Sequence, residues 1–170
     1  LSVMWVDDAL VAARLTRAIG SQLTPDVLLD SVRLRGLLSS LRNIDMPATA
    51  GRLIDYPWQL VHENADEIVR QSALRPFNIA GRVYPGAHLI TDQSIHIGAG
   101  AKIKPGAVLD TESGPIYIDA NVTVNPGAVI AGPCFIREGC VLQPGASIRA
   151  GCSIGMMCTV GGKVEGTIFP

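Results

Sequence analysis

Four cysteines with regular spacing are the first candidates for chemistry in this chain, because clustered thiolates bind zinc and paired thiols form disulfides. They are Cys134, Cys140, Cys152 and Cys158, separated by 6, 12 and 6 residues, and no Cys-x-x-Cys pair is present. The spacing fits a six-residue repeat in which Cys134 lies under Cys152 and Cys140 under Cys158, about 4.8 Å apart. A disulfide between such neighbours is geometrically allowed, but a reducing compartment disfavours it. We therefore predict two ladders of small core side chains and no metal site.

Three histidines are the candidates for acid–base chemistry, because an imidazole exchanges a proton near neutral pH. His62 lies in a predicted helix and His88 at a predicted corner, whereas His96 stands between two inward-facing isoleucines and should project outward. His96 is therefore the candidate catalytic residue; the simpler alternative is a structural or exposed histidine. Histidines that share a metal on one wall of a β-helix should recur about every 18 residues, and positions 88 and 96 do not.

The four cysteines lie in a six-residue repeat that runs from Ile118 to Val164. Eight consecutive hexads begin with Ile, Val or Leu, and their fifth place holds only Val, Ala or Cys. Alternate residues of a strand face opposite sides, so the first and fifth places point inward, and glycine at the fourth place permits a corner with positive φ. Such glycines are Gly127, Gly139, Gly145 and Gly151. A short fixed period of this kind predicts a mainly β fold, a parallel β-helix.

The repeat is interrupted once before this run. Hexads begin at Ile97 and Ile103, but from Leu109 the next inward aliphatic residue falls at Ile118, nine residues on rather than six. About three extra residues should therefore bulge from a corner within residues 110–115. Loops on a rigid scaffold often bind ligands, and a tolerated insertion is the equal alternative. The substrate-binding candidates are Thr111, Glu112, Ser113 and Gly114.

Residues 1–75 have a different pattern and are predicted to form a mainly helical segment before the β-helix of residues 76–170. A short strand over 1–6 precedes an alanine-rich helix over 9–19, which Gly20 ends. Thr24-Pro25-Asp26 is typical of a helix start, and apolar spacing continues that helix to about Arg42. After a loop over 46–51, Tyr56-Pro57-Trp58 opens a helix that ends near Leu74.

Composition excludes two classes of partner. With 14 basic and 15 acidic residues the net charge is -1, so neither nucleic acid nor a membrane surface is expected to bind. No apolar run is long enough to span a bilayer and no signal peptide opens the chain, so we expect a cytoplasmic protein. Phosphate-loop and nucleophile-elbow motifs are absent. Both ends, at Leu1 and at the uncapped Pro170, are expected to be cuts through a longer protein.

The hexads resemble those of the left-handed β-helix of hexapeptide-repeat transferases, many of which are trimeric acyltransferases that use acetyl-CoA. Four segments resemble a narrower group, the sugar nucleotidyltransferases similar to the bifunctional N-acetylglucosamine-1-phosphate uridyltransferase and glucosamine-1-phosphate acetyltransferase. The segments are Tyr56-Pro-Trp-Gln-Leu-Val-His-Glu-Asn64, Gly114-Pro-Ile-Tyr-Ile118, Gly132-Pro133 and Val160-Gly-Gly-Lys-Val-Glu165. The resemblance covers about residues 52–170.

The resemblance implies that residues 1–75 are the end of a nucleotidyltransferase-like domain plus a linker, and that the solenoid walls form a homotrimer. The parent protein would make activated sugars for cell-envelope precursors. It would use a sugar phosphate with a nucleoside triphosphate and magnesium, or acetylate an amino sugar with acetyl-CoA. Neither active-site signature falls within this chain, so no cofactor is expected in the fragment itself. The alternatives are a non-catalytic trimeric hexapeptide scaffold and a metal-dependent β-helical hydratase.

Overall fold

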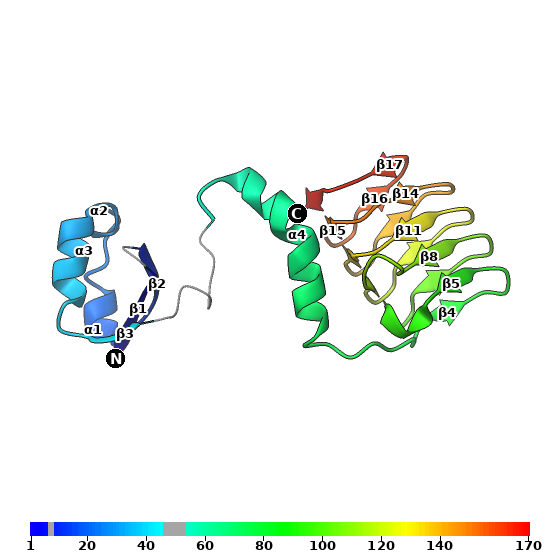
Figure 1. The fold of residues 1–170 in the computed structure, drawn as a ribbon. Helices are drawn as coiled ribbons and strands as arrows, with labels where there is room; N and C mark the ends of the chain where they lie inside the picture. Colours follow the sequence, from blue (N-terminus) through cyan, green and yellow to red (C-terminus); the bar gives the residue numbers. More distant parts are fainter. Residues whose placement is uncertain (7–8, 46–53) are drawn as a thin grey trace. The chain divides into compact units, whose positions relative to one another are not determined.

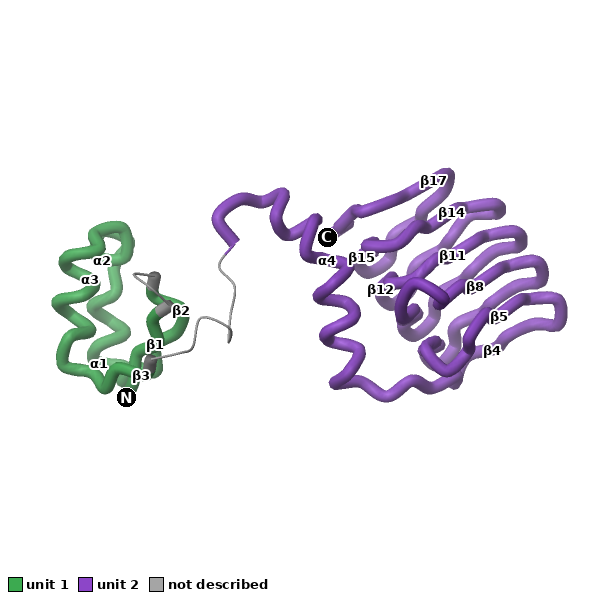
Figure 2. Tube along the Cα trace, viewed as in Figure 1, with its two compact units in different colours: residues 1–53 green, residues 54–170 purple. Residues whose placement is uncertain are grey.

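The computed structural model describes residues 1–6, 9–45 and 54–170, which belong to two compact units, residues 1–53 and 54–170 (Figure 2). The predicted boundary between the first segment and the solenoid lies at residue 75. In the structure the helix over residues 57–72 belongs to the second unit, because it packs on the solenoid. The predicted loop over 46–51 lies outside the described residues.

The first unit contains the predicted helices and, in addition, a three-stranded sheet of order β2-β1-β3 that the sequence analysis did not predict beyond its first strand. Its strands are β1 (Ser2–Val6), β2 (Ala9–Arg14) and β3 (Arg42–Asp45). Strand β1 confirms the predicted strand and pairs antiparallel with β2 and parallel with β3. The predicted helix over 9–19 is wrong for residues 9–14, which pair with β1, because strand pairing outweighs the helix preference of alanine.

The predicted helix over 25–42 begins at Pro25 but is broken after Leu29. The helices of this unit are α1 (Arg17–Gly20), α2 (Pro25–Leu29) and α3 (Ser31–Leu38). Asp30 has extended backbone angles, and its carboxylate accepts hydrogen bonds from the amides of Val32 and Arg33 at 3.0 and 3.1 Å. Asp30 therefore caps a second helix instead of continuing the first.

The second unit is a parallel β-solenoid of five coils in its described residues, which confirms the predicted β-helix (Figure 1). Each coil adds one short strand to each of three five-stranded parallel sheets. The β4 wall contains β4 (Arg82–Val83), β7 (Lys102–Ile103), β10 (Thr123–Val124), β13 (Val141–Leu142) and β16 (Thr159–Val160). The β5 wall contains β5 (His88–Ile90), β8 (Val108–Asp110), β11 (Val129–Ala131), β14 (Ser147–Ile148) and β17 (Lys163–Val164). The β6 wall contains β6 (Ile95–Ile97), β9 (Ile116–Ile118), β12 (Cys134–Ile136), β15 (Cys152–Ile154) and β18 (Ile168–Phe169).

The solenoid core consists of the side chains at the first and fifth hexad places. Ile118, Ile130 and Leu142 are fully buried, as the alternation of strand residues predicts. The predicted positive φ at the fourth-place glycines is confirmed, with φ 73° at Gly127 and 70° at Gly145. Repeated corners with the same geometry let the three walls stay in register from coil to coil.

Corner length varies along the solenoid. Thr123 pairs with Val141 and Val141 with Thr159, so these coils repeat every 18 residues. Lys102 pairs with Thr123, 21 residues on, which confirms the predicted three-residue insertion. The hexad predicted from Val160 is wrong, because Val164 pairs with Ile148 and takes the first place rather than the fifth. The corner between β16 and β17 is therefore two residues shorter than the regular six-residue step.

Helix α4 (Pro57–Ser72) confirms the predicted helix and packs against β12 and β15 on the outside of the β6 wall (Figure 1). The Gln59 side chain accepts hydrogen bonds from the amides of Asp55 and Tyr56 at 2.7 and 3.0 Å, which fixes the helix start. Ile68 is buried, whereas Leu60 and Val69 are exposed. Among the helices of the described residues, none has the length and apolar character needed to cross a membrane.

Candidate functional site

The outer face of the β6 wall carries a ladder of side chains, one from each of four successive coils. His96, Tyr117, Phe135 and Ser153 lie in register on β6, β9, β12 and β15. The ring centroids of His96 and Tyr117 are 5.5 Å apart and those of Tyr117 and Phe135 are 6.2 Å apart. We call the space between this ladder, α4 and the segment that follows α4 the α4 groove.

Two sets of hydrogen bonds hold α4 on the wall. The Asn64 amide donates to the carbonyl of Gly151 at 2.8 Å and accepts from the Ser153 hydroxyl at 2.8 Å. At the other end of the helix, the Tyr117 hydroxyl lies 3.1 Å from the carbonyl oxygen of Arg75, to which it donates. Burial raises the pKa of Tyr117, so the phenol stays protonated and remains a donor. The polar groups of these side chains already form hydrogen bonds within the protein, so few of them can bind a substrate.

The α4 groove contains two pockets that share Arg75, Tyr117 and Phe135. The smaller, of about 80 Å³, lies beside α4 and includes Glu67 and Ser153. The larger, of about 210 Å³, is lined by Arg75, Pro76, His96, Tyr117, Asp119 and Phe135. The larger pocket is the better candidate for a ligand because it combines aromatic surface with both signs of charge.

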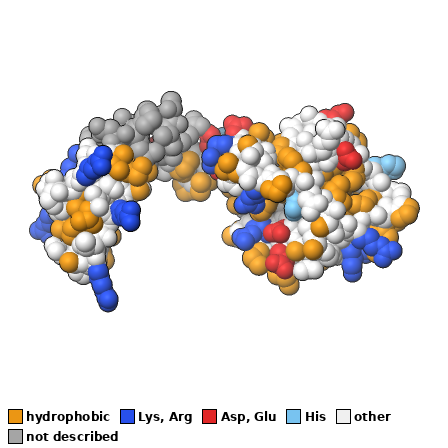
Figure 3. Space-filling model, turned by 90° about the horizontal axis from the view of Figure 1, so that it is seen from below, with side chains coloured by type: hydrophobic (Ala, Val, Ile, Leu, Met, Phe, Trp, Pro, Cys, Tyr) orange, Lys and Arg blue, Asp and Glu red, His pale blue; other side chains and the backbone are white. Residues whose placement is uncertain are grey.

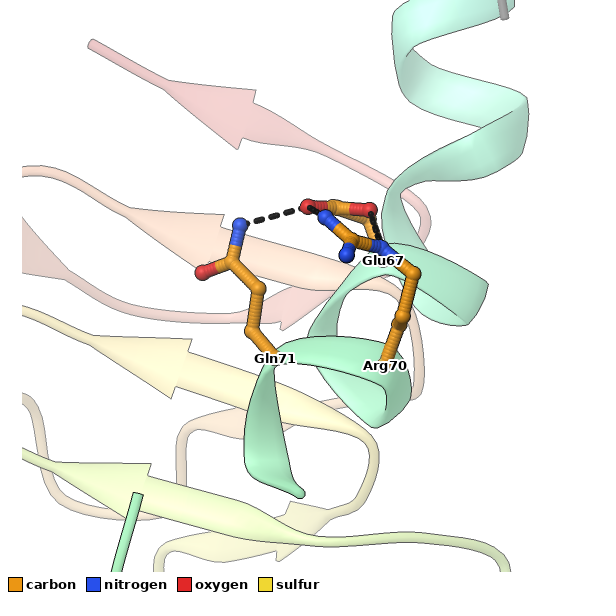
Figure 4. Close-up of polar contacts among 3 residues, drawn as sticks. All are labelled: Glu67, Arg70 and Gln71. Atoms are coloured by element: carbon orange, nitrogen blue, oxygen red, sulfur yellow. Dashed lines mark hydrogen bonds and ion pairs between the residues drawn. The ribbon is translucent and has the colours of Figure 1, made fainter. Parts of the chain in front are cut away.

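The Glu67 carboxylate in the smaller pocket is hydrogen-bonded to neighbouring side chains on α4 (Figure 4). Its carboxylate accepts hydrogen bonds from Arg70 at 2.8 and 2.6 Å and from Gln71 at 2.6 Å. The Arg70 hydrogen bond, followed by that from Gln71, lowers the pKa of Glu67 to about 2. A carboxylate that is ionised at neutral pH and already paired is poorly suited to act as a general acid.

The structure places His96 in the larger pocket but leaves it without a catalytic partner. Its Nδ1 atom is sealed from solvent and has no hydrogen-bond partner among the described residues. His62 is exposed on α4, and His88 is exposed on the β5 wall, a different wall from that of His96. Within residues 1–6, 9–45 and 54–170, no group of three His, Cys, Asp or Glu side chains could hold a metal ion.

The four candidates in the bulge divide into two kinds. Thr111 is buried, and its hydroxyl donates to the carbonyls of Ile90 and Thr91, at 2.8 and 2.7 Å. Gly114 lies against Pro133 of the next coil, where a Cβ on Gly114 would approach the ring to 2.8 Å. Both residues hold the corner together. Only the side chains of Glu112 and Ser113 are exposed, so only these two candidates are open to a ligand.

The cysteines lie in the two predicted positions of the core. Cys134 pairs with Cys152 in register, and Cys140 and Cys158 precede the paired strands β13 and β16. All four are free; the first three are fully buried and Cys158 is half-buried. Burial raises the pKa of the Cys134, Cys140 and Cys152 thiols, which keeps them protonated and poorly nucleophilic.

Sequence reasoning missed Arg75, Tyr117, Asp119 and Phe135 as members of a site. A signal for two of them was present, because Tyr117 and Phe135 directly precede the inward Ile118 and Ile136 and must face outward. Two aromatic residues facing outward on successive coils indicate a covered wall. The contribution of Arg75 had no such signal, because it depends on where the segment after α4 runs.

Charge gives no sign of a nucleic-acid surface on the face shown in Figure 3. Basic and acidic side chains both occur on this face of the second unit, in small separate groups. This distribution agrees with the net charge of -1. A continuous basic surface, which is typical of nucleic-acid binding, is not visible from this side.

No protein-family model matches the sequence, and no curated protein matches it.

Proposed function

We propose that this chain is part of a cytoplasmic transferase that makes activated sugars, and that its solenoid, wound left-handed, joins three copies into a homotrimer. The parent reaction would be nucleotidyl transfer to a sugar 1-phosphate or acetyl transfer to an amino-sugar phosphate. In this proposal the solenoid supplies the assembly and α4 connects it to the nucleotidyltransferase-like domain.

The observation that supports the proposal is that residues from three of the four motifs behind the resemblance form contacts that hold α4 and successive coils together. Asn64 of the first motif binds the β6 wall, and Tyr117 of the second donates to the segment after α4. Gly114 of the second motif packs against the third, Gly132-Pro133, on the next coil. If the chain shares the architecture of the transferases that it resembles, its motif residues should hold the helix and the solenoid in one arrangement.

The two groups that the resemblance implies do not find a site among the described residues. No group of three acidic, Cys or His side chains there could hold a metal ion by protein ligands alone. The Tyr117 hydroxyl donates to the carbonyl of Arg75, so it is not free to bind a pantetheine arm. In this proposal the described residues contribute the assembly and the attachment of α4.

The direct test is an activity panel on the chain and on the longer parent protein. Pyrophosphate release is measured with sugar 1-phosphates, nucleoside triphosphates and magnesium, and product formation from acetyl-CoA is followed by chromatography. Turnover by the parent in either assay supports the proposal. Light scattering of the chain should give three times its own mass, and a monomer would contradict the assembly role.

A non-catalytic trimeric scaffold is the second candidate, and one observation favours it. The hydroxyls of Thr111 and Tyr117, two of the polar groups nearest the candidate sites, donate to backbone carbonyls rather than facing solvent. A trimer combined with no turnover by the parent in either assay would favour this scaffold over the transferase.

A further inference from the structure

The larger pocket of the α4 groove contains two opposite charges that do not pair. Arg75 and Asp119 both line it, yet neither forms an ion pair in the described part of the chain. Asp119 accepts one hydrogen bond, from the amide of Ala120 at 2.9 Å to Oδ1. Its second carboxylate oxygen and the Arg75 guanidinium are therefore both available to a ligand that carries the opposite charges.

The pocket wall between these charges is aromatic. Tyr117 is buried among the rings of His96, Phe77 and Phe135, with centroid distances of 5.5, 5.1 and 6.2 Å. The Arg75 guanidinium lies 5.4 Å from the centre of the Phe135 ring, which orients it along this surface. A ligand ring can rest on such a surface in an offset or edge-on arrangement.

His96 adds a third polar group. Because Nδ1 is sealed and has no partner, the ring nitrogen available to the pocket is Nε2. A buried N–H without an acceptor is rarer than a buried acceptor without a donor, so the tautomer with the proton on Nε2 is favoured. His96 then presents a donor to the same pocket that Arg75 lines.

We propose that the larger pocket binds a small aromatic zwitterion, the chemical class of an aromatic α-amino acid. The carboxylate pairs with Arg75 and accepts from His96, the ammonium group pairs with Asp119, and the ring packs on Tyr117 and Phe135. The cavity of about 210 Å³ is of the size of one such molecule, and the two side-chain charges cancel those of a zwitterion. The inference does not depend on the transferase proposal.

Three probes that differ by one group test the assignment on the full chain. L-phenylalanine carries both charges, 3-phenylpropionate lacks the ammonium group, and phenethylamine lacks the carboxylate. Titration calorimetry should give a dissociation constant for L-phenylalanine on the order of 1 mM, because a small ligand in an open pocket gains little per atom. Each single-charge probe should bind about tenfold more weakly, as expected for one lost charge-assisted hydrogen bond.

Two variants assign each charge to its residue. Arg75→Gln should weaken L-phenylalanine and 3-phenylpropionate about tenfold and leave phenethylamine unchanged. Asp119→Asn should weaken L-phenylalanine and phenethylamine by a similar factor and leave 3-phenylpropionate unchanged. Circular dichroism of each variant checks that it is folded like the unaltered chain.

Arg82→Gln is the matched control, because Arg82 also lies over an aromatic ring, that of Tyr84 at 4.4 Å, but on the β4 wall. It should leave the binding of every probe unchanged. No heat of binding for L-phenylalanine at 10 mM, equal affinity for the three probes, or equal loss in the Arg75 and Arg82 variants would each overturn the proposal.

Discussion

Removing the Asn64 amide tests how α4 is held on the solenoid. Asn64→Ala deletes two hydrogen bonds of 2.8 Å, one to the carbonyl of Gly151 and one from the hydroxyl of Ser153. Each neutral bond contributes about 1 kcal/mol, so the free energy of unfolding should fall by about 2 kcal/mol. Ser153→Ala removes only the second bond and should cost about 1 kcal/mol.

The double variant separates this interaction from general damage. Since the Asn64–Ser153 bond is lost in both single variants, Asn64→Ala with Ser153→Ala should cost about 2 kcal/mol rather than the sum of about 3 kcal/mol. Urea unfolding followed by far-ultraviolet circular dichroism measures the cycle. Gln71→Ala is the control, because Gln71 is exposed on the same helix and donates to Glu67. Its cost should stay below about 0.5 kcal/mol.

Hydrogen exchange then locates the loss. In Asn64→Ala the amides of α4 should exchange about thirtyfold faster, the factor that corresponds to about 2 kcal/mol, while the amides of β12 should keep their protection. A coupling energy below about 0.3 kcal/mol, within the error of additivity, would refute the argument that the two side chains act as one attachment. So would equal loss of protection in the helix and the strand.

Three further predictions follow from single sites. Because the pKa of Glu67 is lowered from 4.5 to about 2, its ionised form stabilises the fold above pH 4.5, and this contribution is lost as the pH falls toward 2. Glu67→Gln should remove that dependence, about 0.5 kcal/mol for an exposed helical pair, in urea midpoints measured across this range; an unchanged acid response would contradict it. His96→Phe should raise the free energy of unfolding by about 1 kcal/mol by removing the unpaired Nδ1, and a lower thermal midpoint would count against this. Gly132→Ala should cost more than about 3 kcal/mol because the new Cβ meets the carbonyl oxygen of Gly114. Gly145→Ala, with open space but φ 70°, should cost only about 1 kcal/mol; equal urea midpoints for the two variants would refute the packing argument.

The solenoid could be predicted because its information is local and repeated. Each hexad shows its inward places, its glycine corner and its neighbours at a fixed distance, so even the insertion before Ile118 is visible as a change in spacing. The same logic puts Cys134 beside Cys152. The exception is Val164. Its place in the hexad depends on a shortened corner, and the repeat pattern of the sequence does not predict that shortening.

The first unit and the site could be predicted less well because they depend on contacts between distant residues. Residues 9–14 form a strand because β1 lies beside them. Asp30 ends one helix because its carboxylate accepts a hydrogen bond from the first turn of the next helix. In the α4 groove, the outward position of His96 follows from its neighbours. Its enclosure with Arg75 and Asp119 depends on where the chain runs after α4, which spacing does not encode.

The unequal corners of the solenoid have a consequence for how its length can change. Inward residues on successive walls are four residues apart from Val160 to Val164 and nine apart from Leu109 to Ile118, yet each corner advances the chain by one wall. Insertions within a corner therefore leave every later strand in its own sheet. Deleting one strand together with its corner would turn all later strands by one wall and carry Ser153 away from α4. Only the loss of a whole coil restores the arrangement, so the solenoid can shorten without rearranging only by complete turns.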